Sequence, residues 1–242
     1  MTCSAMKGAW AVREVVPERA WWLGWSLGGL VSLAAAAAHP QAIRGVVLLA
    51  TTPRFVVGAG WEQAVDAGVF DQFAKQLQAD VGRTLLRFLS LQVKGADHGG
   101  ETLRQLRSGL RKKPPPDGVA LSSGLRLLQR ADLRHELAAS ELPLFWLLGG
   151  RDMLVPAGVR HEYSAIQASV ISGAGHAPFL SHRDEFLGIL RRFLDSLEPG
   201  IDEGDRRHGR TRTRGVGDHL ARSRTPNCLD QGEGALLRLS RN

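Results

Sequence analysis

Continuous apolar runs alternate with amphipathic stretches along this chain, and the alternation predicts its main elements. Runs of successive apolar residues are typical of parallel strands that are buried on both faces of a sheet. We expect such strands at Trp21–Trp25, Gly45–Thr51, Leu144–Leu148 and Ser169–Ser172. Stretches with helical periodicity follow them and predict helices over Leu27–His39, Pro156–Ile166 and Arg183–Leu197. The pattern therefore predicts an α/β fold, doubly wound around a mostly parallel sheet.

A long segment without strand signals interrupts this alternation between Thr51 and Leu144. Apolar residues recur at helical spacing within it, over Trp61–Leu77, Val81–Val93, Thr102–Leu110 and Val119–Leu128. An insertion of this length between two core strands is typical of a lid over an active site. Simple elaboration of the fold is the alternative. We interpret residues 54–140 as a helical lid.

A serine lies between the first expected strand and the helix that follows it, in Gly24-Trp25-Ser26-Leu27-Gly28. A sharp strand-to-helix turn with the pattern G-x-S-x-G presents its serine hydroxyl at the end of the sheet, as in the nucleophile elbow of α/β-hydrolases. A glycine-rich loop that opens a helix is the alternative interpretation. The strand before the motif and the helix after it favour the nucleophile elbow.

A serine hydroxyl needs a neutral imidazole as its base and a carboxylate that orients the imidazole. Asp152 and His176 follow the third and fourth expected strands, in the order serine, acid, histidine that α/β-hydrolases use. A turn aspartate that caps the next helix is the alternative for Asp152, and His182 is the competing histidine. We predict that Ser26 attacks an ester, that His176 is the base and Asp152 the acid, and that the backbone N–H of Leu27 stabilises the oxyanion.

Basic residues dominate the charge of the chain, which has a formal net charge of +7. Between Gly82 and Lys113, eight basic residues face only Asp97 and Glu101, which leaves a local charge of +6. A solvated helical face is the ordinary explanation of such a run, and a docking surface for an acidic partner is the alternative.

Two cysteines, Cys3 and Cys228, lie near opposite ends of the sequence and have no metal-ligand spacing. We therefore expect no disulfide framework, no metal and no cofactor, and a reducing cytoplasm as the location. The longest apolar stretch is too short to span a bilayer, so we expect no membrane segment.

The composition changes near Pro199, where a Gly- and Arg-rich segment begins. Its few large apolar residues cannot offset the entropy cost of ordering, so we expect residues 199–242 to be a disordered, adventitious tail. No aromatic residues interleave with its arginines, which argues against binding of nucleic acid. Residues 1–198 then form a partial α/β-hydrolase domain.

Three segments carry a closer resemblance: Trp22–Leu30 around the serine, Arg87-Phe88-Leu89-Ser90-Leu91-Gln92, and Gly175–His182. Together they resemble the pimeloyl-[acyl-carrier protein] methyl ester esterases of biotin synthesis. The resemblance implies a monomeric cytoplasmic carboxylesterase that demethylates a pimeloyl group carried on acyl carrier protein. It implies a Ser26–Asp152–His176 triad and substrate contacts from Ser26, Leu27, His176 and the acyl pocket formed by Phe88, Leu89, Ser90, Leu91 and Gln92. It also implies that Arg83, Arg87, Arg104 and Arg107 grip the acidic carrier protein.

The chain departs from this family before Ser26. Family members carry a His-Gly-Trp-Gly loop, which supplies a second oxyanion N–H, and this chain has no such sequence. We therefore expect a chain that is N-terminally truncated relative to the family, poorly active, and left with an exposed apolar edge at Trp21–Trp25. Two alternatives stay open: another small-ester α/β-hydrolase, such as a cofactor-free haloperoxidase, and an inactive remnant.

Overall fold

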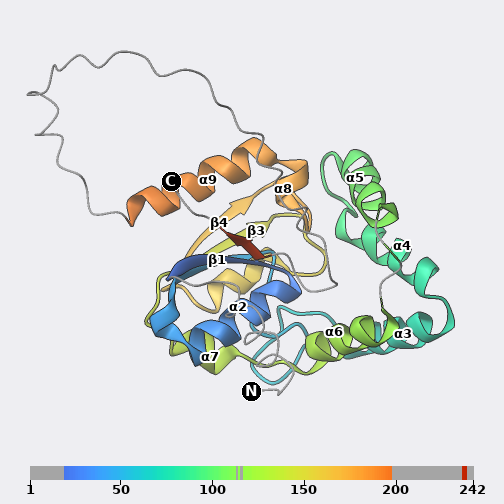
Figure 1. The fold of residues 1–242 in the computed structure, drawn as a ribbon, viewed down its shortest axis with the longest axis horizontal. Helices are drawn as coiled ribbons and strands as arrows, with labels where there is room; N and C mark the ends of the chain where they lie inside the picture. The colour runs from blue at the N-terminus through green and yellow to red at the C-terminus, as the bar shows by residue number, and fades with distance from the viewer. Residues whose placement is uncertain (1–18, 113, 115–116, 198–235, 239–242) are drawn as a thin grey trace, which may run out of the picture.

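A sheet of five strands organises the part of the chain that the computed structural model describes, which is residues 19–112, 114, 117–197 and 236–238. The strands are β1 (Ala20–Trp25), β2 (Ile43–Leu49), β3 (Leu144–Gly149), β4 (Gln167–Ile171) and β5 (Leu236–Arg238), in the order β4-β3-β2-β1-β5. β1 to β4 are parallel, and β5 pairs antiparallel with β1 (Figure 1). The mostly parallel α/β sheet expected from the sequence is thus confirmed.

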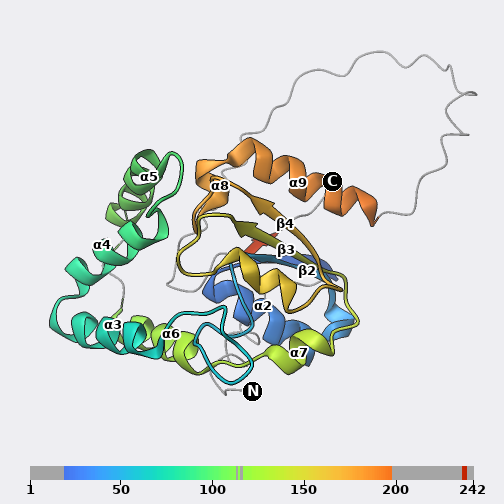
Figure 2. The ribbon, with the colours of Figure 1, turned by 180° about the vertical axis from the view of Figure 1, so that it is seen from behind.

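Helices cover both faces of this sheet, which explains why the strands are apolar at successive positions. One face packs on α2 (Leu27–Ala38) and the other on α9 (Arg183–Ser196) (Figures 1 and 2). Side chains alternate between the two faces along β1: Trp22 lies in the α2 cluster, whereas Trp21 and Leu23 lie in the α9 cluster. The central strands β2 and β3 are mostly buried, and Trp146 and Leu147 on β3 are both 0% exposed.

The short helices show where sequence patterns were insufficient. The helix expected over Pro156–Ile166 is wrong: this segment contains only the 3-10 helix η2 (Ala157–His161) followed by turns. Tyr163 packs against Trp61 and Trp146 and donates its hydroxyl to the carbonyl of Arg134, so tertiary contacts determine the path of the segment. The remaining short elements are η1 (Pro40–Ala42), α7 (Arg134–Ala138) and α8 (Pro178–Ser181).

Residues 54–140, called the helical insertion from here on, contain four longer helices between β2 and β3. These are α3 (Ala67–Ala79), α4 (Val81–Gln92), α5 (Gly99–Arg111) and α6 (Gly118–Arg130). The side chains of Asp66, Asp80 and Asp117 cap α3, α4 and α6. The expected helix over Trp61–Leu77 therefore begins only at Ala67. Within the described part of the chain, no helix is long and apolar enough to cross a membrane.

The helices α3, α4, α5 and α6 of the insertion lie to one side of the sheet, whereas α7 packs against α2 (Figure 2). The segment after α6 is joined to the residue that precedes the insertion by a hydrogen bond from the N–H of Leu133 to the carbonyl of Pro53, 2.9 Å long. Asp132 adds ion pairs to Arg54 at 2.6 Å and to Arg134 at 2.8 Å. The hydrogen bond from Arg134 is the main reason why the pKa of Asp132 is lowered to about 2. These contacts, called the neck from here on, join the start of the insertion to the segment after α6. The insertion is also attached to the core by buried residues such as Trp61 and Leu133.

The outer edge of β1 is covered over part of its length. Trp22, Leu23 and Gly24 pair with Arg238, Leu237 and Leu236 of β5. The structure thus differs from the expected open edge along these three residues, and from a tail without ordered structure at 236–238. The other residues of the expected tail (199–235 and 239–242) and both cysteines lie outside the described residues.

Candidate active site

Ser26 lies at a sharp turn where β1 ends and α2 begins. Its φ of 53° and ψ of −120° are costly for a residue with a side chain, on the order of 1–3 kcal/mol. The neighbouring strand holds this conformation, because the N–H of Ser26 donates to the carbonyl of Leu49 at 3.0 Å. The hydroxyl of Thr51 donates to the carbonyl of Ser26 at 2.6 Å. The backbone is therefore strained at Ser26 in the manner of a nucleophile elbow.

Glycines allow the strand and helix around Ser26 to approach closely. A Cβ at Gly24 would lie 2.5 Å from the carbonyl oxygen of Gly28, and one at Gly29 would lie 2.3 Å from the Thr51 side chain. Neither contact is possible for a real Cβ. Only glycine therefore fits at Gly24, the first glycine of the motif, and at Gly29, directly after the motif.

Asp152 follows β3 and is 6% exposed. One carboxylate oxygen accepts hydrogen bonds from the N–H groups of Leu154 and Val155, at 2.8 and 3.0 Å. The other oxygen lies 2.7 Å from Nδ1 of His176. Asp152 therefore stabilises the turn that it begins with one carboxylate oxygen and contacts His176 with the other.

His176 lies in the loop after β4 and is 0% exposed. Its Nε2 is 2.8 Å from Oγ of Ser26. An ionised carboxylate only accepts hydrogen bonds, so a neutral His176 carries its proton on Nδ1 toward Asp152 and leaves Nε2 to accept the Ser26 hydroxyl. The structure thus brings together the three side chains selected from the sequence. His182, the competitor, instead contacts the hydroxyl of Ser181 and the ring of His98.

Leu27 is the first residue of α2, so its N–H has no acceptor within the helix. It adjoins Ser26 at the positive end of the helix dipole, where negative charge is stabilised. This is the position that the sequence assigns to an oxyanion donor.

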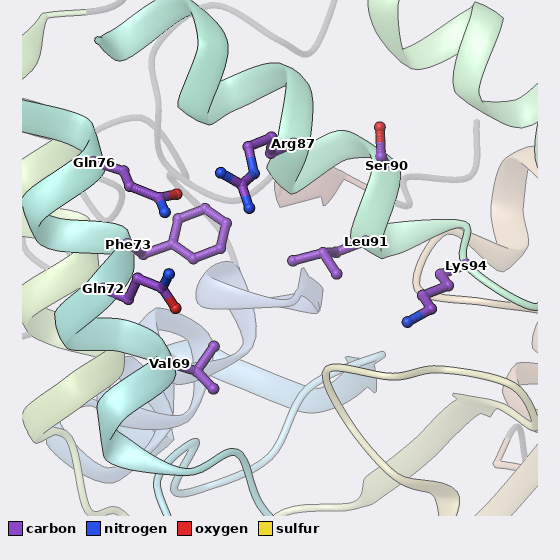
Figure 3. Close-up of a pocket in the computed structure, with 8 residues that line it drawn as sticks. All are labelled: Val69, Gln72, Phe73, Gln76, Arg87, Ser90, Leu91 and Lys94. Atoms are coloured by element: carbon purple, nitrogen blue, oxygen red, sulfur yellow. The ribbon is translucent and has the colours of Figure 1, made fainter. Parts of the chain in front are cut away.

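The expected acyl-binding residues occupy different places on α4. Ser90 and Leu91 line a pocket of about 490 Å³ between α3 and α4 (Figure 3), whereas Phe88 packs edge-on against Phe73. Gln92 is buried at the end of α4, and its backbone carbonyl accepts the N–H of His176 at 2.9 Å. Its side-chain Oε1 has no hydrogen-bond partner among the described residues. The end of α4 is therefore in direct contact with the histidine loop.

The expected docking arginines lie on α4 and α5 with different exposure. Arg83, Arg87 and Arg104 are exposed, and Arg87 also reaches the pocket between α3 and α4 (Figure 3). Arg107 is partly buried, and its guanidinium lies 3.5 Å from the hydroxyl of Ser90. Arg107 thus bridges the two helices, while the other three face solvent.

Two connections of the site have no counterpart in the sequence prediction. The indole N–H of Trp25 donates to the carbonyl of His176 at 2.7 Å. The guanidinium of Arg151 binds the carbonyl of Gly95 at 3.1 Å and the carboxylate of Asp97 at 2.8 Å. Both connections join segments that are distant in sequence, so no local pattern points to them. Among the described residues, no group of three or more His, Cys, Asp or Glu could hold a metal ion.

An elbow serine, a histidine and an aspartate at the carboxyl ends of parallel strands define an α/β-hydrolase. A family model described as alpha/beta hydrolase fold matches residues 4–183, and the chain belongs to this family. Within it, the chain is 47% identical over 180 residues to a pimeloyl-[acyl-carrier protein] methyl ester esterase of Xanthomonas campestris, an alignment that covers 73% of this chain and 71% of the relative. A relative of the same name from Stenotrophomonas maltophilia is 46% identical over 182 residues, covering 74% and 70%.

Solved structures agree on the fold. An esterase from Exiguobacterium antarcticum superposes with a TM-score of 0.70 at 19% identity, covering 80% of this chain and 75% of that one. A bromoperoxidase from Bacillus anthracis gives a TM-score of 0.63 at 20% identity, covering 76% and 70%. By its relationship to the curated esterases, the chain is a carboxylic ester hydrolase, as the sequence predicts.

Proposed function

We propose that this chain hydrolyses the methyl ester of pimeloyl-[acyl-carrier protein] with Ser26, His176 and Asp152 as its catalytic triad. The observation that carries the proposal is the continuous hydrogen-bonded chain from Ser26 Oγ to His176 Nε2 and from His176 Nδ1 to Asp152, with contacts of 2.8 and 2.7 Å. The names of the curated relatives support the substrate.

The reaction follows from this geometry. His176 Nε2 takes the proton of the Ser26 hydroxyl as Oγ attacks the ester carbonyl carbon. Asp152 stabilises the imidazolium, and the N–H of Leu27 donates to the oxyanion of the tetrahedral intermediate. Collapse of this intermediate expels methanol, which takes the proton from His176, and leaves an acyl-enzyme. His176 then deprotonates a water that attacks the acyl-enzyme, releasing the free carboxylate and restoring the Ser26 hydroxyl.

We assign substrate admission to the helical insertion, which acts as a lid in this proposal. Phe88, Leu89, Ser90, Leu91 and Gln92 provide the acyl-binding surface together with Ser26, Leu27 and His176. The contact between Gln92 and the histidine loop supports this role, because it places one end of α4 beside the reacting groups. The proposal requires no metal or organic cofactor.

We assign carrier-protein docking to Arg83, Arg87, Arg104 and Arg107. The exposure of the first three supports this role, and the partly buried Arg107 contributes through the packing of α5 on α4. The proposal includes a cytoplasmic location and a monomeric chain, as expected from the sequence.

The experiment compares Arg87→Glu with Arg44→Glu. Arg44 is also exposed, but it lies near the amino end of β2, whereas the triad lies at the carboxyl ends of the strands. Arg44→Glu therefore changes the net charge by the same amount as Arg87→Glu, at the opposite end of the sheet. We expect kcat/KM on the carrier-bound methyl ester to fall about tenfold in Arg87→Glu at low salt, because long-range attraction accelerates association. Turnover of p-nitrophenyl acetate stays within about twofold in both variants.

Equal losses on the two substrates would contradict the docking role. Turnover of the small ester alone by the unmodified chain would instead favour a small-ester hydrolase with another substrate.

A further inference from the structure

His176 is held through its backbone from two sides. Its N–H donates to the carbonyl of Gln92 at 2.9 Å, and its carbonyl accepts the indole N–H of Trp25 at 2.7 Å. His176 is 0% exposed, so bulk water does not reach these backbone groups in the folded chain. The indole of Trp25 is the only hydrogen-bond donor to this carbonyl among the described residues.

Trp25 comes from the nucleophile elbow itself. It is the last residue of β1, directly before Ser26, and its side chain belongs to the cluster on the α9 face. Its ring also packs edge-on against Phe179, with centroids 4.9 Å apart, and lies 5.8 Å from the ring of His176. Trp25 therefore contacts the segment from His176 to Phe179 at two points.

The reaction depends on the position of this segment. The imidazole must reach Ser26 with one nitrogen and Asp152 with the other, and both contacts shift if the backbone of His176 moves. Small displacements of catalytic groups lower rates strongly, on the order of 100-fold for about 1 Å. A bond from the residue beside Ser26 to the carbonyl of His176 fixes the nucleophile and the base to each other.

We infer that Trp25 is a positioning residue, whose indole N–H holds His176 in line with Ser26. The inference rests on the proposed function, since it assumes that His176 is the base. Trp25 occupies the second position of the G-x-S-x-G motif, and the inference gives it a role in addition to core packing.

The test compares Trp25→Phe with Trp22→Phe. The control removes the same atoms from a residue of the same strand that is 5% exposed and faces α2, away from His176. A second variant carries β-(3-benzothienyl)alanine at position 25, which keeps the shape of the indole and replaces its N–H by sulfur. All variants are measured as the full chain, with p-nitrophenyl acetate as substrate.

We expect kcat to fall about tenfold in both position-25 variants with KM within about twofold, because the bond orients the base and does not bind substrate. The downfield proton NMR signal of Nδ1–H of His176 broadens or shifts in these variants. Trp22→Phe leaves kcat and this signal unchanged. If Trp25→Phe does not fold, the benzothienyl variant decides.

Unchanged kcat and an unchanged Nδ1–H signal in the position-25 variants would overturn the inference. A rise in KM at constant kcat would also overturn it, because Trp25 would then bind substrate. Full ester turnover by Ser26→Ala would instead contradict the proposed function, and the NMR comparison would still decide whether Trp25 positions His176.

Discussion

The sheet and the helical insertion are stabilised in different ways. On β2 and β3, residues such as Val47, Trp146 and Leu147 are 0% exposed and pack against helices on both faces. The helices of the insertion bury far less: α3 buries Phe70 and Leu77, and α5 buries only Thr102. Elements with few buried apolar contacts open locally at lower free energy. The triad is thus carried by the more deeply buried region, and we expect the helices of the insertion to open locally at lower free energy.

The two regions meet through apolar residues such as Trp61 and Leu137, which are buried in the cluster on the α2 face, and through a few hydrogen bonds. Besides the neck at Asp132, the end of α4 touches the histidine loop through Gln92, and Asp97 reaches both Arg151 and the carbonyl of Gly173. The insertion is therefore in direct contact with the loops that carry Asp152 and His176. These contacts support the proposed role of the insertion in substrate admission.

The largest difference between the regions is expected from truncation of buried and half-exposed leucines. Leu147→Ala removes a side chain that is 0% exposed in the α9 cluster, and we expect the free energy of unfolding to fall by about 2–5 kcal/mol. Leu86→Ala removes the same atoms from α4, where the residue is 41% exposed, and we expect about 0.5 kcal/mol. Urea titration of both variants measures the contrast, and similar losses would refute it.

A smaller effect is expected at the neck. Because the pKa of Asp132 is lowered to about 2, its ionised form stabilises the fold above the unfolded-state pKa near 4. This stabilisation is lost as the pH falls from about 4 through about 2. Asp132→Asn should lower the free energy of unfolding at pH 7 by only about 1 kcal/mol, because the side chain is 34% exposed and screened by water.

Asp132→Asn should lower the free energy of unfolding by less in acid than at pH 7. Urea titrations at pH 7 and near pH 2.5 are expected to show a shrinking difference between Asp132→Asn and the unmodified chain. A difference that is constant with pH would mean that the ionised carboxylate does not stabilise the neck.

Sequence patterns predicted the region with a continuous core better than the region around it. The strands β1, β2 and β3 could be located because burial on both faces leaves a nearly unbroken apolar signal. The helix α9 could be located because its buried residues, Phe186, Leu190 and Phe193, recur at helical spacing. The boundary of β2 was misplaced, since Ala50 leaves the sheet with a φ of 44° that apolar content does not reveal. The expected helix at Pro156–Ile166 is absent because the contacts of Tyr163 override its periodicity.

The three triad residues of the candidate site could be predicted because their order along the chain constrains where they lie in the fold. Ser26, Asp152 and His176 each follow a strand of a parallel sheet, so the carboxyl ends of the strands bring them together. The bonds that hold them, from Trp25 to His176 and from His176 to Gln92, cross from one loop to another. Such contacts depend on side-chain directions in the folded chain and leave no spacing pattern in the sequence.

The central claim is that His176 activates Ser26, and reaction with a fluorophosphonate probe tests it most directly. The full chain is treated with the probe at neutral pH, and modified peptides are identified by mass spectrometry. We predict a single adduct on Ser26 that is lost in His176→Ala and kept in His182→Ala. The absence of an adduct on Ser26, or labelling that survives in His176→Ala, would contradict the claim.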